Sequence, residues 1–174
     1  DIISTYKKGT DFSIYMDTDG LIHAGSGLDQ VTWMDVRVGD WVATPRHGKP
    51  VEINALWYNA LCTMDMLQAK FGDNDDSYRQ LASLVKASFN KRFWNENTGC
   101  LYDVVDEDDD TIRPNQIYAV SLPFTMPDME REKAIVDTVM DKLYVGCGLR
   151  SLDPDHTDYH PIYIGSLSKR DHAY

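Results

Sequence analysis

The 174-residue sequence has few cysteines, no long apolar run and relatively few basic side chains. Cys62, Cys100 and Cys147 lie at no spacing typical of a metal site, which favours reduced thiols inside the cell. No stretch approaches the roughly 20 consecutive apolar residues of a membrane-spanning helix. The first residues, DIISTYKKGTDF, contain no apolar signal-peptide core. We therefore expect a cytoplasmic protein with no membrane partner.

Acidic residues outnumber basic ones by 28 to 17, giving a net charge of −11. Binding to nucleic-acid phosphates needs clustered Lys and Arg, so no nucleic-acid partner is expected. The acidic runs DTDG (17–20), DNDD (73–76) and DEDDD (106–110) suggest calcium, but none has the ligand spacing of an EF-hand. We expect these runs to be solvated loops.

Other cofactor motifs are also missing. His156 and His160 are four residues apart, but Pro154 and Pro161 flank them and disfavour a helical zinc-binding pair. The GSG at 25–27 lacks the spacing of a dinucleotide-binding loop, and neither a P-loop nor a GxSxG nucleophile motif occurs. We expect neither a metal nor an organic cofactor.

Apolar periodicity predicts four helices, over residues 51–71, about 75–93, 114–122 and about 128–144. Their expected core positions include Leu56, Leu67 and Leu84. Between the second and third helices, the sequence FWNENTGCLYDVV predicts a β-hairpin, because Asn-Thr-Gly favours a turn. The remaining segments are predicted to be loops.

Short connections alternate with long ones along this order. The long loops should therefore gather at one end of the helices, as in a toroid of helical hairpins whose functional residues lie at its mouth. Because four helices cannot close such a ring, we expect the chain to form only part of one all-α domain.

Carboxylates, aromatic rings and cations are concentrated within about thirty residues. A sugar site combines aromatic platforms with charged hydrogen-bonding groups, and glycoside hydrolysis needs two carboxyl groups. An acidic loop in any aromatic-rich protein has a similar composition, so composition alone leaves sugar chemistry open. The residues are Asp29, Trp33, Asp35, Arg37, Asp40, Trp41, Arg46, His47, Lys49, Glu52, Trp57 and Tyr58.

Longer motifs narrow the choice. The segments GLDQVTWMDVRVGDWVATPRHGKPVEINALWYNAL, FWNENTGCLYDVVD, IRPNQIYAVSLPF, GLRSLDPDHTDYHPIYIGS and RDHAY occur in this order. They resemble the C-terminal amylo-α-1,6-glucosidase domain of glycogen debranching enzymes, particularly the prokaryotic type. The resemblance implies an (α/α)6 barrel, with residues 1–174 as part of that domain and short β-hairpins in its loops. It also implies removal of α-1,6-linked glucose at branch points, with inversion.

The resemblance implies that Asp35 is the general acid. The family's base is a glutamate downstream of RDHAY, so the isolated 174 residues are expected to be inactive. Expected substrate-binding residues are Trp33, Trp41, Arg46, Lys49, Glu52, Asn54, Trp57, Arg113 and Gln116. Some have other interpretations: Trp57 as helical core, Glu52 as a helix-dipole cap, and Arg46 or Lys49 as its partner. Asp158 and Tyr159 are weaker candidates for the rim.

The implied partners are a branched α-glucan, such as a glycogen limit dextrin, and the remainder of the protein's own full-length chain. Two alternatives remain open. Another (α/α)6 glycosidase, with glucoamylase, trehalase or α-glucosidase activity, would keep the fold and change the linkage. A non-catalytic carbohydrate-binding module would use the same aromatic residues without turnover.

Overall fold

The structure is a computed structural model that describes residues 2–72 and 75–171, so parts of the DNDD run and of the RDHAY motif lie outside the described residues. Helices and short strands alternate along the chain. The helices are α1 (Ile2–Lys8), α2 (Val51–Phe71), α3 (Ser77–Arg92), the 3-10 helix η1 (Pro114–Ile117), α4 (Tyr118–Ser121), α5 (Met129–Lys142) and α6 (Leu167–Asp171). The strands are β1 (Tyr15–Met16), β2 (Ile22–His23), β3 (Val36–Val38), β4 (Trp41–Ala43), β5 (Lys49–Pro50), β6 (Trp94–Asn95), β7 (Cys100–Leu101) and β8 (Val104–Val105).

The predicted all-α fold, an (α/α)6 barrel covered in part, is wrong. Across the described residues the strands form antiparallel two-stranded sheets, β1–β2, β3–β4, β5–β8 and β6–β7, so the fold is mixed α and β. Each strand has only two or three residues, too few for a visible period-2 alternation. The β5–β8 pair also joins segments that are distant in sequence, which local patterns do not reveal.

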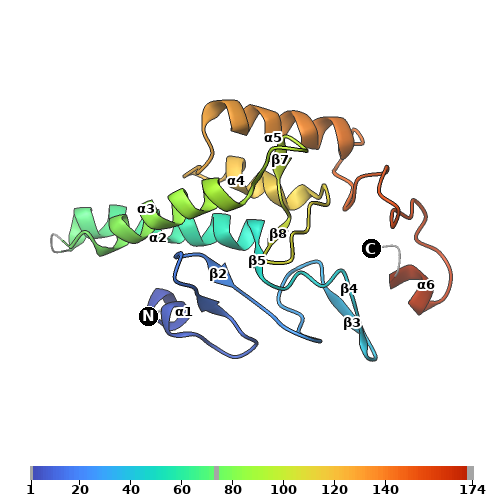
Figure 1. Ribbon diagram of the computed structural model, residues 1–174, viewed down its shortest axis with the longest axis horizontal. Coiled ribbons are helices and arrows are strands. Elements are labelled where there is room, and N and C mark those ends of the chain that lie inside the picture. The colour runs from blue at the N-terminus through green and yellow to red at the C-terminus, as the bar shows by residue number, and fades with distance from the viewer. Residues whose placement is uncertain (1, 73–74, 172–174) are drawn as a thin grey trace.

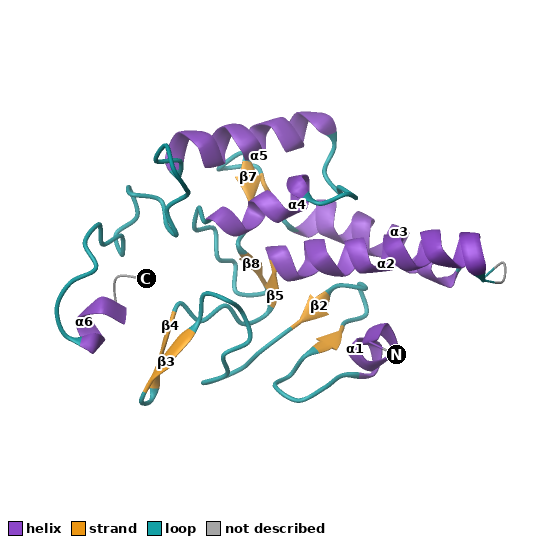
Figure 2. Ribbon diagram, turned by 180° about the vertical axis from the view of Figure 1, so that it is seen from behind, coloured by secondary structure: helices purple, strands orange, loops and turns teal. Residues whose placement is uncertain are grey.

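The central feature is the antiparallel pair of long helices, α2 and α3 (Figures 1 and 2). Helix α2 has the predicted bounds: Pro50 occupies the N-cap, and the Gly72 N–H donates to the Gln68 carbonyl at the other end. Helix α3 buries Ala82, Val85 and Phe89, which share one face at helical spacing. The pair therefore provides the frame on which the loops are placed.

Layers lie on both sides of this pair. Helix α4 and η1 separate α2 from α5, while β1–β2 and α1 lie on the opposite side (Figure 1). The third predicted helix is divided into η1 and α4, and the fourth corresponds to α5, whose N-cap Asp128 accepts a hydrogen bond from the Arg131 N–H at 2.9 Å. The buried core at these interfaces includes Leu21, Ile22, Val51, Ala55, Leu61, Val85, Phe89, Phe93, Leu101, Ala119, Met126 and Ile135.

The segment ahead of α2 is held between two others. Gly48 pairs with Ala24 on one side, and β5 pairs with β8 on the other. Gly48 has φ +104°, and a Cβ there would lie 2.8 Å from the Val105 carbonyl oxygen, so this close approach requires glycine. Pro50 ends β5 and caps α2, which places the strand and the helix in direct succession.

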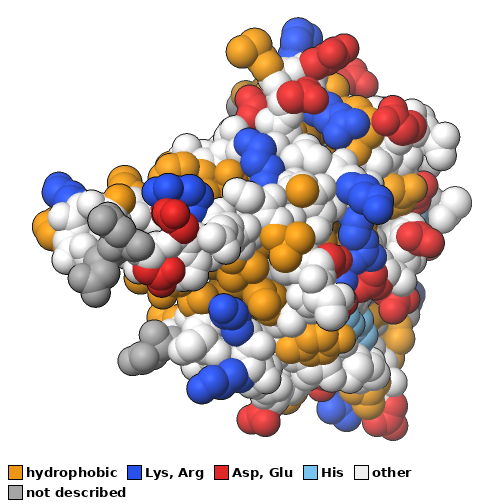
Figure 3. Space-filling model, turned by 60° about the vertical axis from the view of Figure 1, so that its left-hand side comes forward, with side chains coloured by type: hydrophobic (Ala, Val, Ile, Leu, Met, Phe, Trp, Pro, Cys, Tyr) orange, Lys and Arg blue, Asp and Glu red, His pale blue; other side chains and the backbone are white. Residues whose placement is uncertain are grey.

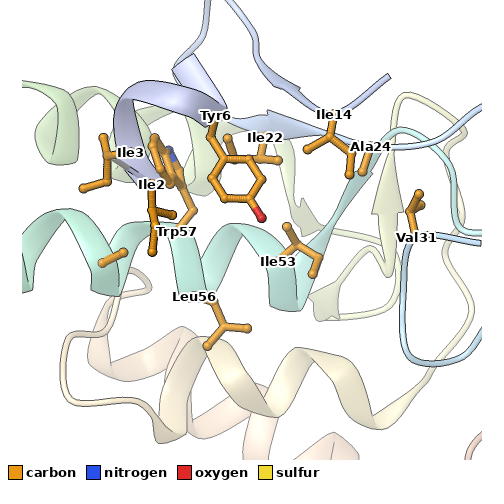
Figure 4. Close-up of a pocket in the computed structure, with 11 residues that line it drawn as sticks. Ile2, Ile3, Tyr6, Ile14, Ile22, Ala24, Val31, Ile53, Leu56 and Trp57 are labelled. Atoms are coloured by element: carbon orange, nitrogen blue, oxygen red, sulfur yellow. The ribbon is translucent and has the colours of Figure 1, made fainter. Parts of the chain in front are cut away.

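An apolar groove of about 280 Å³ lies between α1, the β1–β2 hairpin and α2 (Figure 4). Ile2, Tyr6, Ile14, Ile53 and Trp57 contribute to its lining. Figure 3 shows hydrophobic side chains gathered on the face beneath the projecting end of the α2–α3 pair. Three predicted core residues, Leu56, Leu67 and Leu84, are exposed instead, with 40–45% of their surfaces accessible. In the part of the chain that is described, no helix is both long and apolar enough to cross a membrane.

Candidate active site

The TWMD loop (residues 32–35) is closed by its own aspartate. The Asp35 carboxylate accepts hydrogen bonds from the Val31 N–H at 2.9 Å, the Thr32 N–H at 2.7 Å and the Thr32 hydroxyl at 2.8 Å. Its exposed fraction is only 9%. Asp35 therefore lies just beneath the surface and fixes the shape of the loop that carries Trp33.

Trp33 and Met34 attach this loop to η1. The Trp33 Nε1–H donates to Asn115 Oδ1 at 3.0 Å, while 57% of the Trp33 residue surface stays exposed. Met34 is fully buried, and its sulfur accepts from Asn115 Nδ2 at 3.1 Å. One buried amide thus contacts two neighbouring residues of the TWMD loop.

A buried ion cluster lies on the far side of Asn115. The Arg46 guanidinium donates to both Glu52 oxygens, at 2.5 and 2.6 Å, and to Asp103 Oδ2 and Oδ1, at 2.6 and 3.1 Å. Arg46 has no exposed surface, and only 2% of Glu52 and of Asp103 is exposed. Each ion is therefore hydrogen-bonded where water cannot solvate it.

Burial acts on both members of the Arg46–Asp103 pair. Burial disfavours the charge on Arg46, but its hydrogen bonds and its attraction to the two carboxylates outweigh this and raise its pKa. Burial raises the pKa of Asp103, while the Arg46 guanidinium and the Asn115 amide oppose that shift. The cluster is thus stable only while its partners remain in contact.

The 113–116 segment connects the cluster to its surroundings. Asn115 Nδ2 donates to Asp103 Oδ1 at 2.8 Å, and Arg113 Nε lies 3.8 Å from Asp103 Oδ2. Burial lowers the pKa of Arg113, whose Nη1 donates to the Ser151 carbonyl. Gln116 accepts from the Leu101 N–H at 3.3 Å. The predicted residue Arg113 thus lies beside the cluster, while Gln116 bonds to β7.

A polar cavity of about 500 Å³ opens beside Arg113. Its lining combines one indole and two imidazole rings with charged and hydroxyl groups, a mixture suited to a polyhydroxylated ligand. Trp41, Thr44, Asp109, Arg113, His156 and Asp158 contribute to it. Trp41, Arg113 and the rim candidate Asp158 therefore share one cavity, whereas Trp33 and Asp35 do not line it.

The remaining predicted residues lie around the 17–22 segment. Lys49 donates to Asp17 at 2.8 Å and to Asp19 at 2.9 Å, and Asp106 is 3.5 Å away. These three aspartates lie in partly exposed loops, as predicted, but they also pair with Lys49, which the sequence did not reveal. Among the described residues, no group of three or more His, Cys, Asp or Glu side chains is arranged to hold a metal.

Asn54 and Trp57 are tied to the same segment. The Asn54 amide bonds both the N–H and the carbonyl of Ile22, and Trp57 Nε1–H donates to the Gly20 carbonyl at 2.9 Å. Trp57 is 6% exposed and belongs to the core, in line with its alternative interpretation. Direct contact of these residues with substrate stays a prediction.

Asp103 was missed by the sequence reasoning, and Asn115 carried no role in it. One signal for Asp103 was available, because it is a charged residue inside the apolar run 100–105. Such a residue must either face solvent or have a buried partner. Its partner, Arg46, is 57 residues away, so the sequence alone does not identify the pair.

Comparison with known proteins gives two findings. The family model described as amylo-alpha-1,6-glucosidase matches residues 1–174. The glycogen debranching enzyme of Saccharomyces cerevisiae (strain ATCC 204508 / S288c) is 28% identical over 209 aligned residues, which cover 95% of this chain and 13% of the yeast protein. The chain thus spans a small part of the length of this curated relative.

Proposed function

The chain belongs to the amylo-alpha-1,6-glucosidase family, and from this premise we propose that it forms part of a glycoside hydrolase acting on glycogen-type branched α-glucans. The reaction is hydrolysis of the α-1,6-linked glucose at a branch point. The family match over the whole chain carries this proposal. A cytoplasmic location and association with the remainder of a longer chain belong to the same proposal.

Asp35 is the proposed general acid of an inverting mechanism. It lies just below the surface, beside the half-exposed Trp33 ring. To act, one of its oxygens carries a proton and exchanges a hydrogen bond within the 31–35 loop for one to the glycosidic oxygen. Inversion further requires a second carboxylate about 6.5–9.5 Å from the acid, with a water between them and the sugar. We place that base outside the described residues.

The predicted binding residues divide into three groups under this proposal. Trp33 and Trp41 are exposed enough to stack on sugar rings, and Arg113 borders the polar cavity beside Trp41. Arg46, Glu52 and Gln116 are buried and act by positioning these groups. Lys49, Asn54 and Trp57 anchor the 17–22 segment against α2.

Asp35→Asn tests the proposal in the natural full-length protein that carries this chain. Loss of general acid catalysis should lower glucose release from a glycogen limit dextrin by about 10²–10⁴-fold, with dextrin binding retained. Asp29→Asn is the matched control, because Asp29 also closes a turn, by accepting from the Ser26 N–H at 3.0 Å. Undiminished turnover in Asp35→Asn would contradict the assignment.

The same assay separates the alternatives. Faster glucose release from maltose or trehalose than from the limit dextrin would indicate another glycosidase. Dextrin binding without turnover by the unaltered protein would indicate a carbohydrate-binding module.

A further inference from the structure

Trp33 is an exposed ring whose edge is tied to a buried side chain. More than half of its surface faces solvent, yet its Nε1–H ends on the amide of Asn115, which has no exposed surface. We infer that Asn115 is a positioning residue for the Trp33 ring and that the buried Glu52–Arg46–Asp103 cluster sets the direction of the Asn115 amide. This inference rests on the proposed function, in which the ring stacks on a glucose unit.

The donors and acceptors allow one orientation of the Asn115 amide. An indole N–H only donates, so the Asn115 atom facing Trp33 must be the carbonyl oxygen. An ionised carboxylate only accepts, so the atom facing Asp103 must be the amide nitrogen. The observed contacts, 3.0 Å from Trp33 Nε1 to Oδ1 and 2.8 Å from Nδ2 to Asp103 Oδ1, agree with both requirements.

The cluster explains why Asp103 presents its acceptor there. The Arg46 guanidinium engages both Asp103 oxygens, which favours the ionised carboxylate and fixes its plane. Arg46 is itself fixed by two bonds to Glu52, in the first turn of α2. A continuous line of hydrogen bonds therefore runs from the helix start to the surface indole.

This arrangement should affect binding more than chemistry. A ring held in place before substrate arrives loses little freedom when a sugar stacks on it, which strengthens binding. The Nε1 edge of the ring bonds to the buried Asn115 amide while 57% of the Trp33 surface stays exposed, and in the proposed function this exposed part contacts the C–H surface of a sugar. Loss of the Asn115 bond should accordingly raise KM and leave kcat nearly unchanged.

The Trp33–Asn115 hydrogen bond is tested in the full-length protein by changing its donor and its acceptor separately. Trp33→Phe keeps a ring without the N–H, and Asn115→Ala removes the acceptor. Affinity for a glycogen limit dextrin is measured by calorimetry in an Asp35→Asn background, and KM and kcat are measured without that change. Each single variant should weaken binding about 2- to 10-fold, the worth of one net hydrogen bond, and the double variant should be no weaker than either single one.

Asn59→Ala is the matched control. Its amide also makes three hydrogen bonds, to the Ala55 carbonyl and to both backbone groups of Phe124, but none to the TWMD loop. It should lower stability and leave KM unchanged. Trp33→Phe retains every contact of Asn115 to Asp103, so it still gives a result if Asn115→Ala does not fold.

The outcomes are distinct. Losses that add in the double variant, or a kcat effect without a KM effect, overturn the positioning role. If Trp33→Ala leaves dextrin affinity intact while the unaltered protein still releases glucose, the inference fails and the proposed function stands. If the unaltered protein neither binds nor cleaves the dextrin, the proposed function fails, and the inference fails with it.

Discussion

Replacement of Arg46 by Met tests whether the buried cluster holds the site together. The substitution removes the guanidinium but approximately keeps an apolar stem, so the main change is that Glu52 and Asp103 lose their shared partner. Removing one member of a buried ion pair typically costs about 3–5 kcal/mol, because the remaining charge is buried without compensation. That is a large fraction of the roughly 5–15 kcal/mol that stabilises a folded domain.

Unfolding of the full-length protein in urea, followed by tryptophan fluorescence, measures this effect as a shift in the midpoint. Arg79→Met is the matched control, because Arg79 is 59% exposed where it pairs with Asp65 and Asp76. Exposed pairs contribute under about 1 kcal/mol. Arg46→Lys should behave more like Arg46→Met than like the control, since one ammonium cannot replace a guanidinium that serves two carboxylates.

The effect should also depend on pH. Because burial raises the pKa of Asp103, its carboxyl can take up a proton in Arg46→Met as the pH falls, and the destabilisation should shrink. The reasoning would be refuted if Arg46→Met and Arg79→Met shifted the urea midpoint equally. It would also be refuted if the stability lost in Arg46→Met, relative to the unaltered protein, grew as the pH was lowered.

Three further changes have defined outcomes. Gly48→Ala should lower stability by roughly 1–3 kcal/mol in urea unfolding, because φ is +104° and the added Cβ meets a carbonyl oxygen; a neutral result would contradict the close approach. The hydrogen bond from Lys49 lowers the pKa of Asp17 below 3.8, so its stabilisation is present above pH 3.8 and is lost as the pH falls further. The free energy of unfolding of Asp17→Asn should therefore fall less steeply below pH 3.8 than that of the unaltered protein, and an equally steep fall would contradict this. Cys147 is exposed and should react with a maleimide in the folded protein, whereas Cys100 is buried with a raised pKa and should react only on unfolding, as mass spectrometry of the labelled peptides would show.

The long helices were the part of the fold that could be predicted from the sequence. For α2, apolar spacing, Pro50 and Gly72 gave both boundaries, because each of these signals is local. The spacing did not reveal which side of a helix has a neighbour. Leu56 and Leu67 were therefore expected in the core but are exposed.

Features that depend on contacts between residues far apart in the sequence could not be predicted. Strand β5 has two residues and pairs with β8, so neither strand has a recognisable pattern alone. For the site, residue types in 29–58 left sugar chemistry open, and only the ordered motifs indicated the family. The sequence could not show that Asp103 and Asn115 join Arg46 to Trp33, because the Arg46–Asp103 and Trp33–Asn115 contacts span 57 and 82 positions.

The direct succession of β5 and α2 has a consequence for protein engineering. One residue inserted between positions 46 and 52 would turn each preceding strand side chain to the opposite face and rotate the helix start by about 100°, separating the guanidinium from its carboxylates. This stretch should therefore not tolerate a change in length. A tag or fluorescent label is better placed in the β6–β7 turn, where Gly99 has open space around it.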